Sequence, residues 1–179
     1  MKITAIRGIM LRCTCSPISD ALSTSTVRQA LFVKIETDAG LYGIGEAFTY
    51  GAPLKIMKYL VEEQLGPMLI GQDPAEIEKH WNTMYWRTIA HGRRSMTMGA
   101  ISGIDIALWD LLGKAAHMPV CKLLGQHLDR VPSYASGGFY APGKDLHKLE
   151  DELEHYKAQG YRDMKIKIGR TLERSNAPL

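Results

Sequence analysis

The segment AISGIDIALWDLLGKAAHMPVCKLLG, at residues 100–125, begins inside the longest helical pattern of the chain. Over residues 93–116, apolar side chains recur three and four positions apart, as they do on the buried face of an amphipathic helix. These residues are Ile101, Ile104, Leu108, Leu111, Leu112 and Ala115. Ala100 and Ala107 leave room for a neighbouring element to approach closely. The pattern therefore predicts a long helix that lies in a protein core.

The residues that precede this helix predict a small sheet. Residues 2–12 alternate between apolar and polar, which is typical of a strand. Residues 30–37 and 41–47 form the two arms of a predicted hairpin, joined by a turn at Asp38-Ala39-Gly40. The Ser/Thr-rich stretch TCSPISDALSTST, at residues 14–26, predicts a long mobile loop between the first two strands.

A second helix is expected to begin at Asp73-Pro74. Asp73 is predicted as the N-cap, Pro74 as the first helical residue and Glu76 as the third. Apolar side chains at helical spacing follow, at Ile77, Trp81, Met84 and Tyr85. Residues 1–125 are therefore expected to form an α+β domain, with a three-stranded antiparallel sheet and a bundle of helices.

The pattern changes again after residue 125. Residues 131–138 and 163–168 read as strands, and residues 145–158 as the helix between them. A strand, a helix and a strand in this order predict a β-α-β unit with parallel strands. Two strands and one helix do not cover both faces of a parallel sheet, so the second domain, residues 126–179, is expected to be incomplete.

Composition excludes several classes of partner. A net charge of +3, from 22 basic and 19 acidic residues without a long basic block, argues against nucleic acid. No uninterrupted apolar run reaches the roughly 18 residues of a membrane span. The odd number of cysteines, three, favours a reducing compartment. We expect a cytoplasmic protein.

Residues 100–125 resemble the signature of the mandelate racemase/muconate lactonizing enzyme family, within the enolase superfamily. The matching residues are Ala100, Ser102-Gly103-Ile104-Asp105, Ala107-Leu108, Asp110, Gly113-Lys114, Pro119-Val120 and Leu123-Leu124-Gly125. Further matches occur in the family's order, at MKIT, GLYGIGEA, LIGQDP and YRDMKIKIG. The resemblance covers nearly all of residues 1–169.

The resemblance implies an N-terminal capping domain at residues 1–125, followed by the first β-α-β of a TIM-type barrel. A complete barrel takes about 250 residues, so the chain is expected to stop inside the barrel. The implied chemistry is Mg²⁺-dependent removal of the proton α to the carboxylate of a small acid. The loop YASGGFYAPGK resembles that of hydroxy-acid and acid-sugar dehydratases in the family. A racemase, epimerase or cycloisomerase is the alternative, and family members are commonly homo-oligomers.

The resemblance assigns catalytic roles to two lysines in YRDMKIKIG, at residues 161–169. It implies Lys167 as the general base, with Lys165 beside it as a like-charged partner that also helps to hold the substrate. Residues i and i+2 of a strand share a face, so both lysines can face a barrel interior. Taken by itself, the same pattern is also that of a solvated strand face.

Other site residues follow from loops that match the family. Ser16, Ser19 and Thr24 fall in its mobile capping loop, Tyr50 in a second specificity loop, and Tyr140 in the loop after the first barrel strand. Three carboxylates, those of Glu46, Asp105 and Asp110, are expected to be structural, because the matching positions in the family look structural. Asp105 and Asp110 are also five residues apart, which places them poorly on one helix face.

The metal site is expected to lie outside this chain. The family's Mg²⁺ ligands are three carboxylates at the ends of later barrel strands, and Glu173 is the only acid after Gly169. The isolated chain is therefore expected to be inactive. A non-catalytic fragment or interaction domain is the competing hypothesis, and so is an anion-binding module.

Overall fold

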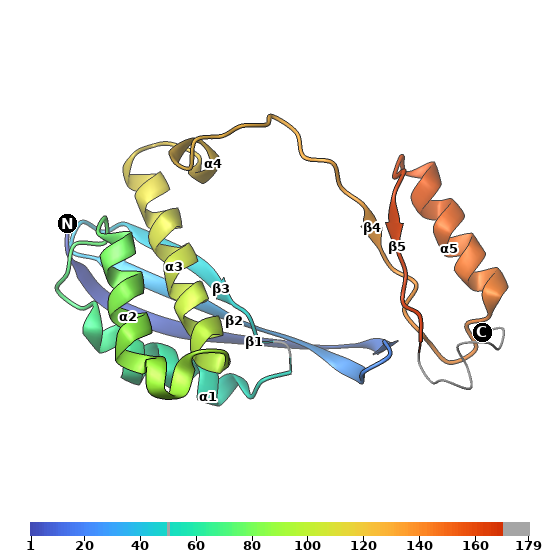
Figure 1. Ribbon diagram of the computed structural model, residues 1–179, viewed down its shortest axis with the longest axis horizontal. Helices are drawn as coiled ribbons and strands as arrows, with labels where there is room; N and C mark the ends of the chain where they lie inside the picture. Colours follow the sequence, from blue (N-terminus) through green and yellow to red (C-terminus); the bar gives the residue numbers. More distant parts are fainter. Residues whose placement is uncertain (50, 170–179) are drawn as a thin grey trace. The chain divides into compact units, whose positions relative to one another are not determined.

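The computed structural model describes residues 1–49 and 51–169, which form two compact units (Figure 1). The first unit comprises Met1–Arg12 and Gln29–His127. The second comprises Cys13–Arg28 and the described residues from Leu128 onward. The proposed domain boundary after residue 125 stays a prediction.

The sheet has three antiparallel strands in the order β1 (Ile3–Ser19), β2 (Thr24–Thr37) and β3 (Tyr42–Ala47). In the β2–β3 hairpin, Leu31 lies opposite Ala47 and Glu36 opposite Tyr42. Gly40 occupies the turn with a φ of 75°, a conformation that glycine adopts without steric cost. The predicted hairpin and its turn are thus confirmed.

Helical elements lie on one face of this sheet (Figure 1). The first three follow one another along the chain, as α1 (Leu54–Tyr59), the π-helical η1 (Leu60–Leu65) and the 3₁₀ turn η2 (Gly66–Met68). They are followed by α2 (Ile77–Gly92), α3 (Met96–Ala115) and α4 (Val120–Leu123).

The core of the first unit lies between α3 and the sheet. Alternate residues of β2 are fully buried, and they pack with the apolar face of α3. These residues are Leu31, Val33 and Ile35 from β2, with Ala100, Ile101, Ile104, Ala107, Leu108 and Leu111 from α3. By length and composition, α3 is the one helix in the described part of the chain that could cross a membrane. Its burial in this core accounts for that composition.

Glycines in β3 allow α3 to lie directly on the strand. A Cβ added to Gly43 would lie 2.8 Å from the Leu111 Cβ, and one added to Gly45 would lie 2.6 Å from the Ala107 N. The main chains of the two elements are therefore in contact, and a side chain at either glycine has no space.

The predicted mobile loop at residues 14–26 is wrong, because both strands continue through it. β1 ends at Ser19 and β2 begins at Thr24. Asp20 closes the turn between them, where its Oδ1 accepts hydrogen bonds from the N–H groups of Leu22 and Ser23, at 2.9 and 3.0 Å. Threonine is common in loops, but as a β-branched residue it also suits a strand, so composition misled the prediction.

The expected start of the second helix is also wrong. α2 begins at Ile77 with Glu76 as its N-cap residue. Asp73 instead forms a turn, in which its Oδ1 accepts a hydrogen bond from the Ala75 N–H at 3.0 Å. The local carboxylate–backbone bond of an Asx turn competes with helix initiation at this position.

The second unit contains the β-α-β arrangement that the sequence predicts. Its elements are β4 (Ala135–Ser136), α5 (Leu146–Ala158) and β5 (Met164–Lys165), and the two strands are parallel. The Asp145 side chain caps α5 by accepting from the Lys148 N–H at 3.0 Å. The strands are shorter than predicted, because each of them pairs over only two residues.

Asp110 on α3 protects the outer edge of β3. Its Oδ2 accepts a hydrogen bond from the Ile44 N–H at 2.7 Å and lies 2.6 Å from the Lys114 Nζ. Lys114 also donates to the Tyr42 carbonyl at 3.0 Å. An edge strand has backbone groups that need such partners, so the structural role predicted for Asp110 is confirmed.

We expect Asp110→Ala to lower the free energy of unfolding of the first unit by about 1–2 kcal/mol, through the lost hydrogen bond and ion pair. Urea unfolding followed by tryptophan fluorescence measures this change, because Trp81, Trp86 and Trp109 all lie in the first unit. Asp105→Ala is the matched control on the same helix. Burial raises the pKa of the Asp105 carboxyl, so its ionised form opposes folding and its removal should cost nothing. Equal losses in the two variants would contradict the prediction.

Candidate active site

The two lysines predicted to be catalytic lie at the end of β5. Lys165 is the last residue of the strand, opposite Ser136, and its side chain is exposed. Lys167 lies two residues further on and is half-buried. Its Nζ lies 5.0 Å from the ring centroid of Phe139, which follows β4. Active sites of parallel α/β folds form where strands end at their carboxyl edge, and Lys167 is at such an edge.

The segment after β4 passes close to both β5 and α5. The Gly137 N–H donates to the Lys165 carbonyl at 2.9 Å. A Cβ at Gly137 would lie 2.5 Å from the Tyr156 hydroxyl, and one at Gly138, which has a φ of 65°, would lie 2.7 Å from the Ile166 Cβ. Two consecutive glycines are therefore required, and they allow residues 137–140 to lie beside Lys167.

Glu152 of α5 holds this segment in place. Its Oε1 accepts hydrogen bonds from the Gly138 N–H at 3.1 Å and from the Tyr156 hydroxyl at 2.8 Å. Its Oε2 pairs with Lys144, whose Nζ donates to the Phe139 carbonyl at 2.9 Å. Sequence reasoning missed Glu152, because on a polar helix nothing distinguishes one glutamate from its neighbours.

The Glu152 carboxyl is stabilised in its ionised form. Burial raises its pKa, but the hydrogen bonds from Lys144, Gly138 and Tyr156 together outweigh burial and hold the pKa below its usual range. The hydrogen bond that the Tyr156 hydroxyl donates to Glu152 raises the pKa of this hydroxyl. The network therefore needs a charged glutamate and a neutral tyrosine.

We expect the second unit to lose stability in acid. Because the pKa of Glu152 is lower in the folded chain, its stabilisation is present above the unfolded value of 4.5 and is lost as the pH falls through the folded-state pKa. Urea titrations at pH 7 and pH 4, followed by the backbone amide NMR signals of α5, measure this loss. Glu152→Gln should lower the unfolding free energy at pH 7 by about 1–3 kcal/mol. It should also flatten the pH dependence, and an unchanged pH dependence would exclude this role.

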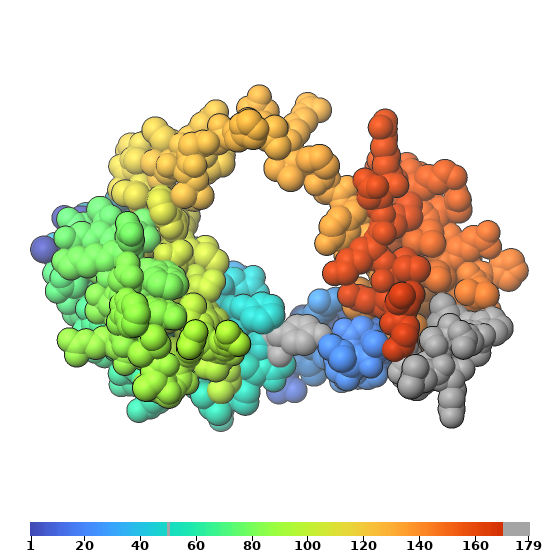
Figure 2. All heavy atoms as spheres, in the orientation of Figure 1, coloured from blue at the N-terminus to red at the C-terminus, as the bar shows by residue number. Residues whose placement is uncertain are grey.

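Three of the residues assigned to specificity loops lie together. Ser19 and Tyr140 exchange two backbone hydrogen bonds of 2.9 and 3.2 Å, and both are buried, at 4% and 7% exposure. The Ser19 and Thr24 hydroxyls are 2.6 Å apart. Figure 2 shows this end of the hairpin (blue) against the segment that contains β4 and β5 (orange to red).

The loop assignment of the hairpin residues needs correction. Ser16 and Ser19 lie on β1 and Thr24 on β2, so they belong to a paired hairpin. Ser16 is exposed on its strand. Tyr50 lies outside the described residues.

Among residues 1–49 and 51–169, no group of three or more His, Cys, Asp or Glu side chains is placed to hold a metal ion. The Glu152 carboxylate, which holds the segment beside Lys167, is already engaged with Lys144 and two further donors.

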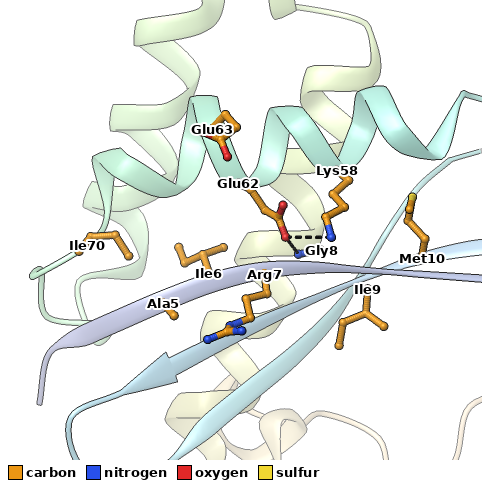
Figure 3. A pocket seen from close by; sticks show the side chains of 10 residues that line it. All are labelled: Ala5, Ile6, Arg7, Gly8, Ile9, Met10, Lys58, Glu62, Glu63 and Ile70. Atoms are coloured by element: carbon orange, nitrogen blue, oxygen red, sulfur yellow. Dashed lines mark hydrogen bonds and ion pairs between the residues drawn. The ribbon is translucent and has the colours of Figure 1, made fainter.

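A depression in the first unit is a different kind of feature. It runs between β1 and the α1–η1 helical segment and contains none of the predicted site residues (Figure 3). Its central carboxylate, Glu62, accepts a hydrogen bond from the Gly8 N–H at 2.8 Å and pairs with Lys58 at 3.4 Å. Glu62 therefore accepts a hydrogen bond from a backbone N–H at the edge of β1, as Asp110 does at the edge of β3.

Comparison with known proteins finds similar sequences in one enzyme family. The family model of the mandelate racemase / muconate lactonizing enzyme N-terminal domain matches residues 4–125. An arabinonate dehydratase of Saccharolobus solfataricus is 42% identical over 76% of the chain. A D-mannonate dehydratase of Novosphingobium aromaticivorans is 37% identical over 94% of it. The chain spans 36% and 38% of these two relatives.

Solved structures agree with these matches. A member of the enolase superfamily from Polaromonas sp. superposes with a TM-score of 0.86 at 35% identity, covering 94% of this chain and 45% of that protein. The L-talarate/galactarate dehydratase of Salmonella typhimurium, solved with Mg and L-lyxarohydroxamate, superposes with a TM-score of 0.83 at 28% identity. That match covers 96% of this chain and 45% of that protein.

Proposed function

The chain belongs to the mandelate racemase/muconate lactonizing enzyme family, and on that premise we propose that it acts in an acid-sugar dehydratase with Lys167 as the general base. The relatives named as dehydratases of arabinonate, mannonate and galactarate support a small sugar acid as the substrate. The observation that carries the proposal is the parallel β4–β5 pair. It brings Lys167 beside the segment 137–140, at the carboxyl edge of the strands.

The proposed reaction begins at the carbon α to the carboxylate. The neutral amine of Lys167 takes the proton from this carbon and becomes an ammonium, and the electron pair of the broken C–H bond passes into the carboxylate as an enolate. The enolate then expels the hydroxyl group of the next carbon, which leaves as water after it takes up a proton. The enol that remains tautomerises to a 2-keto-3-deoxy acid.

We propose Mg²⁺ as the cofactor of the whole enzyme, since the Salmonella relative was solved with it. A divalent cation lowers the cost of the negative charge that develops on the carboxylate. Among the described residues, no group of three or more His, Cys, Asp or Glu side chains is placed to hold a metal ion, and the proposal for this chain is confined to the proton transfer.

The test joins this chain to the barrel of a relative. In a chimera, residues 1–169 replace the matching segment of the Novosphingobium D-mannonate dehydratase, whose similarity covers 94% of this chain. We expect D-mannonate, arabinonate or galactarate, the substrates named for the relatives, to yield a 2-keto-3-deoxy acid, detected as its semicarbazone. A folded chimera that dehydrates none of them, beside an active parent enzyme, would overturn the proposal.

Racemisation is the second candidate. A structure described as a putative mandelate racemase from Bordetella bronchiseptica superposes with a TM-score of 0.87 at 33% identity. The same abstraction by Lys167 would serve this reaction, but the proton would return to the α carbon and no water would be lost. Exchange of the α hydrogen in D₂O without formation of a keto acid would favour this candidate over dehydration.

A further inference from the structure

The ring of Phe139 lies against the side chain that we propose as the base. The Lys167 Nζ is 5.0 Å from the ring centroid, within the roughly 6 Å over which an ammonium is attracted to an aromatic face. Both side chains are half-buried, so water screens the contact only in part. The two residues meet because Phe139 follows β4 and Lys167 follows β5, and these strands are parallel neighbours.

The main chain of Phe139 is held on both sides. Its carbonyl accepts the hydrogen bond from Lys144, which is paired with Glu152, and the Gly138 N–H before it donates to the same carboxylate. The next residue, Tyr140, exchanges its two backbone hydrogen bonds with Ser19. The ring therefore extends from a segment with fixed backbone positions on either side.

We propose that Phe139 is a positioning residue for Lys167, an inference that rests on the proposed function of this lysine. A lysine amine on a flexible four-carbon stem has many rotamers, whereas a general base must lie within hydrogen-bond distance of the proton that it takes. Contact with the ring selects the rotamers that keep the Nζ beside residues 137–140. When the amine takes its proton, the ring faces the ammonium that results and stabilises that charge.

The contact can be measured in the 179-residue chain itself. Reductive ¹³C-methylation gives each lysine methyl signals while keeping its charge, and a ring beneath the amine shifts these signals upfield. In the described chain, Lys34 and Lys114 also lie over a ring, that of Tyr42, at 4.7 and 4.6 Å. We therefore expect upfield-shifted methyl signals from Lys34, Lys114 and Lys167. The signals that disappear in the Lys167→Arg variant are those of Lys167.

Two ring-deleting variants make a matched comparison. Phe139→Leu should return only the Lys167 signal to the position of exposed lysines, whereas Tyr42→Leu should return only those of Lys34 and Lys114. Phe139→Tyr keeps a ring and should keep the shift. Protected amides in α5 show that the second unit is folded in each variant. An unshifted Lys167 in the parent chain, or a shift that survives Phe139→Leu, would overturn the inference.

Activity in the chimera separates this inference from the proposed function. Phe139→Leu should lower kcat by about 10- to 100-fold, the scale of a small misplacement of a catalytic group, with KM changed by less than about twofold. Phe139→Tyr or Phe139→Trp should restore most of kcat, because both rings bind cations. Activity that survives Lys167→Ala would refute the proposed base. An unchanged kcat in Phe139→Leu, with Lys167 still essential, would refute only the role of Phe139.

Discussion

Gly43→Ala and Gly45→Ala are each expected to destabilise the first unit by about 3 kcal/mol or more, the upper range for an overpacked core. The methyl group at residue 43 would meet the Ala107 carbonyl and the Leu111 Cβ, and that at residue 45 would meet the Gly103 carbonyl and the Ala107 N. These are mainly backbone atoms, which cannot move aside as the end of a flexible side chain can. Such a loss is a large part of the 5–15 kcal/mol that usually stabilises a domain.

Gly8→Ala is the matched control in the same sheet. A Cβ at Gly8 would lie 3.0 Å from the Lys58 Cγ and 3.3 Å from the Leu31 Cδ1, and both atoms belong to side chains that can adjust. We expect this variant to change the unfolding free energy by less than about 1 kcal/mol. Urea unfolding followed by tryptophan fluorescence compares the three variants. If the Gly43→Ala variant proved as stable to urea as the Gly8→Ala variant, this would show that α3 does not lie directly on β3.

Lys167→Ala is expected to lower the dehydration rate of the chimera by about 10²–10⁴-fold, the usual contribution of a general base. The same variant should abolish exchange of the α hydrogen of the substrate in D₂O, since the amine is proposed to take this proton. Loss of the exchange distinguishes the base from a residue that acts only on the leaving hydroxyl. The assays are keto-acid formation and the NMR signal of the α hydrogen.

Lys157→Ala serves as the control for this experiment. Lys157 is exposed near the end of α5, where its Nζ lies 3.2 Å from a Glu154 oxygen. An exposed ion pair within one helix contributes little to stability. We therefore expect the Lys157→Ala chimera to dehydrate its substrate at the rate of the parent chimera. A Lys167→Ala chimera that keeps more than about a tenth of the parent rate would be inconsistent with general-base catalysis.

Periodic patterns in the sequence predicted most of the fold. The stripe from Ile101 to Leu111 is the buried face of α3, and the hairpin with its turn at Gly40 occurs as expected. Residues 145–158 predicted α5 to within one residue, because Asp145 is a strong N-cap. The family resemblance is confirmed by the match to residues 4–125.

Predictions from short stretches of sequence were wrong where the same residues are compatible with two kinds of structure. The stretch 14–26 has the serines and threonines of a loop and also those of a strand. The turn at Asp20 decides between them by bringing Ser19 and Thr24 together. At Asp73, the carboxylate binds the Ala75 N–H in a turn before the helix begins. In both places, a side-chain hydrogen bond to a nearby backbone group changed the boundary of an element.

The sequence by itself determined most of the secondary structure, because helices and strands depend on residue types and on their spacing. It also determined the family, through motifs that match it, and that resemblance singled out the two lysines to test. Only the tertiary structure decided which groups meet across the chain. It placed Gly43 and Gly45 against α3, Tyr140 against Ser19, and Phe139 against Lys167. These contacts join residues far apart in sequence, and they exist only where the packing of strands and helices brings their backbones together.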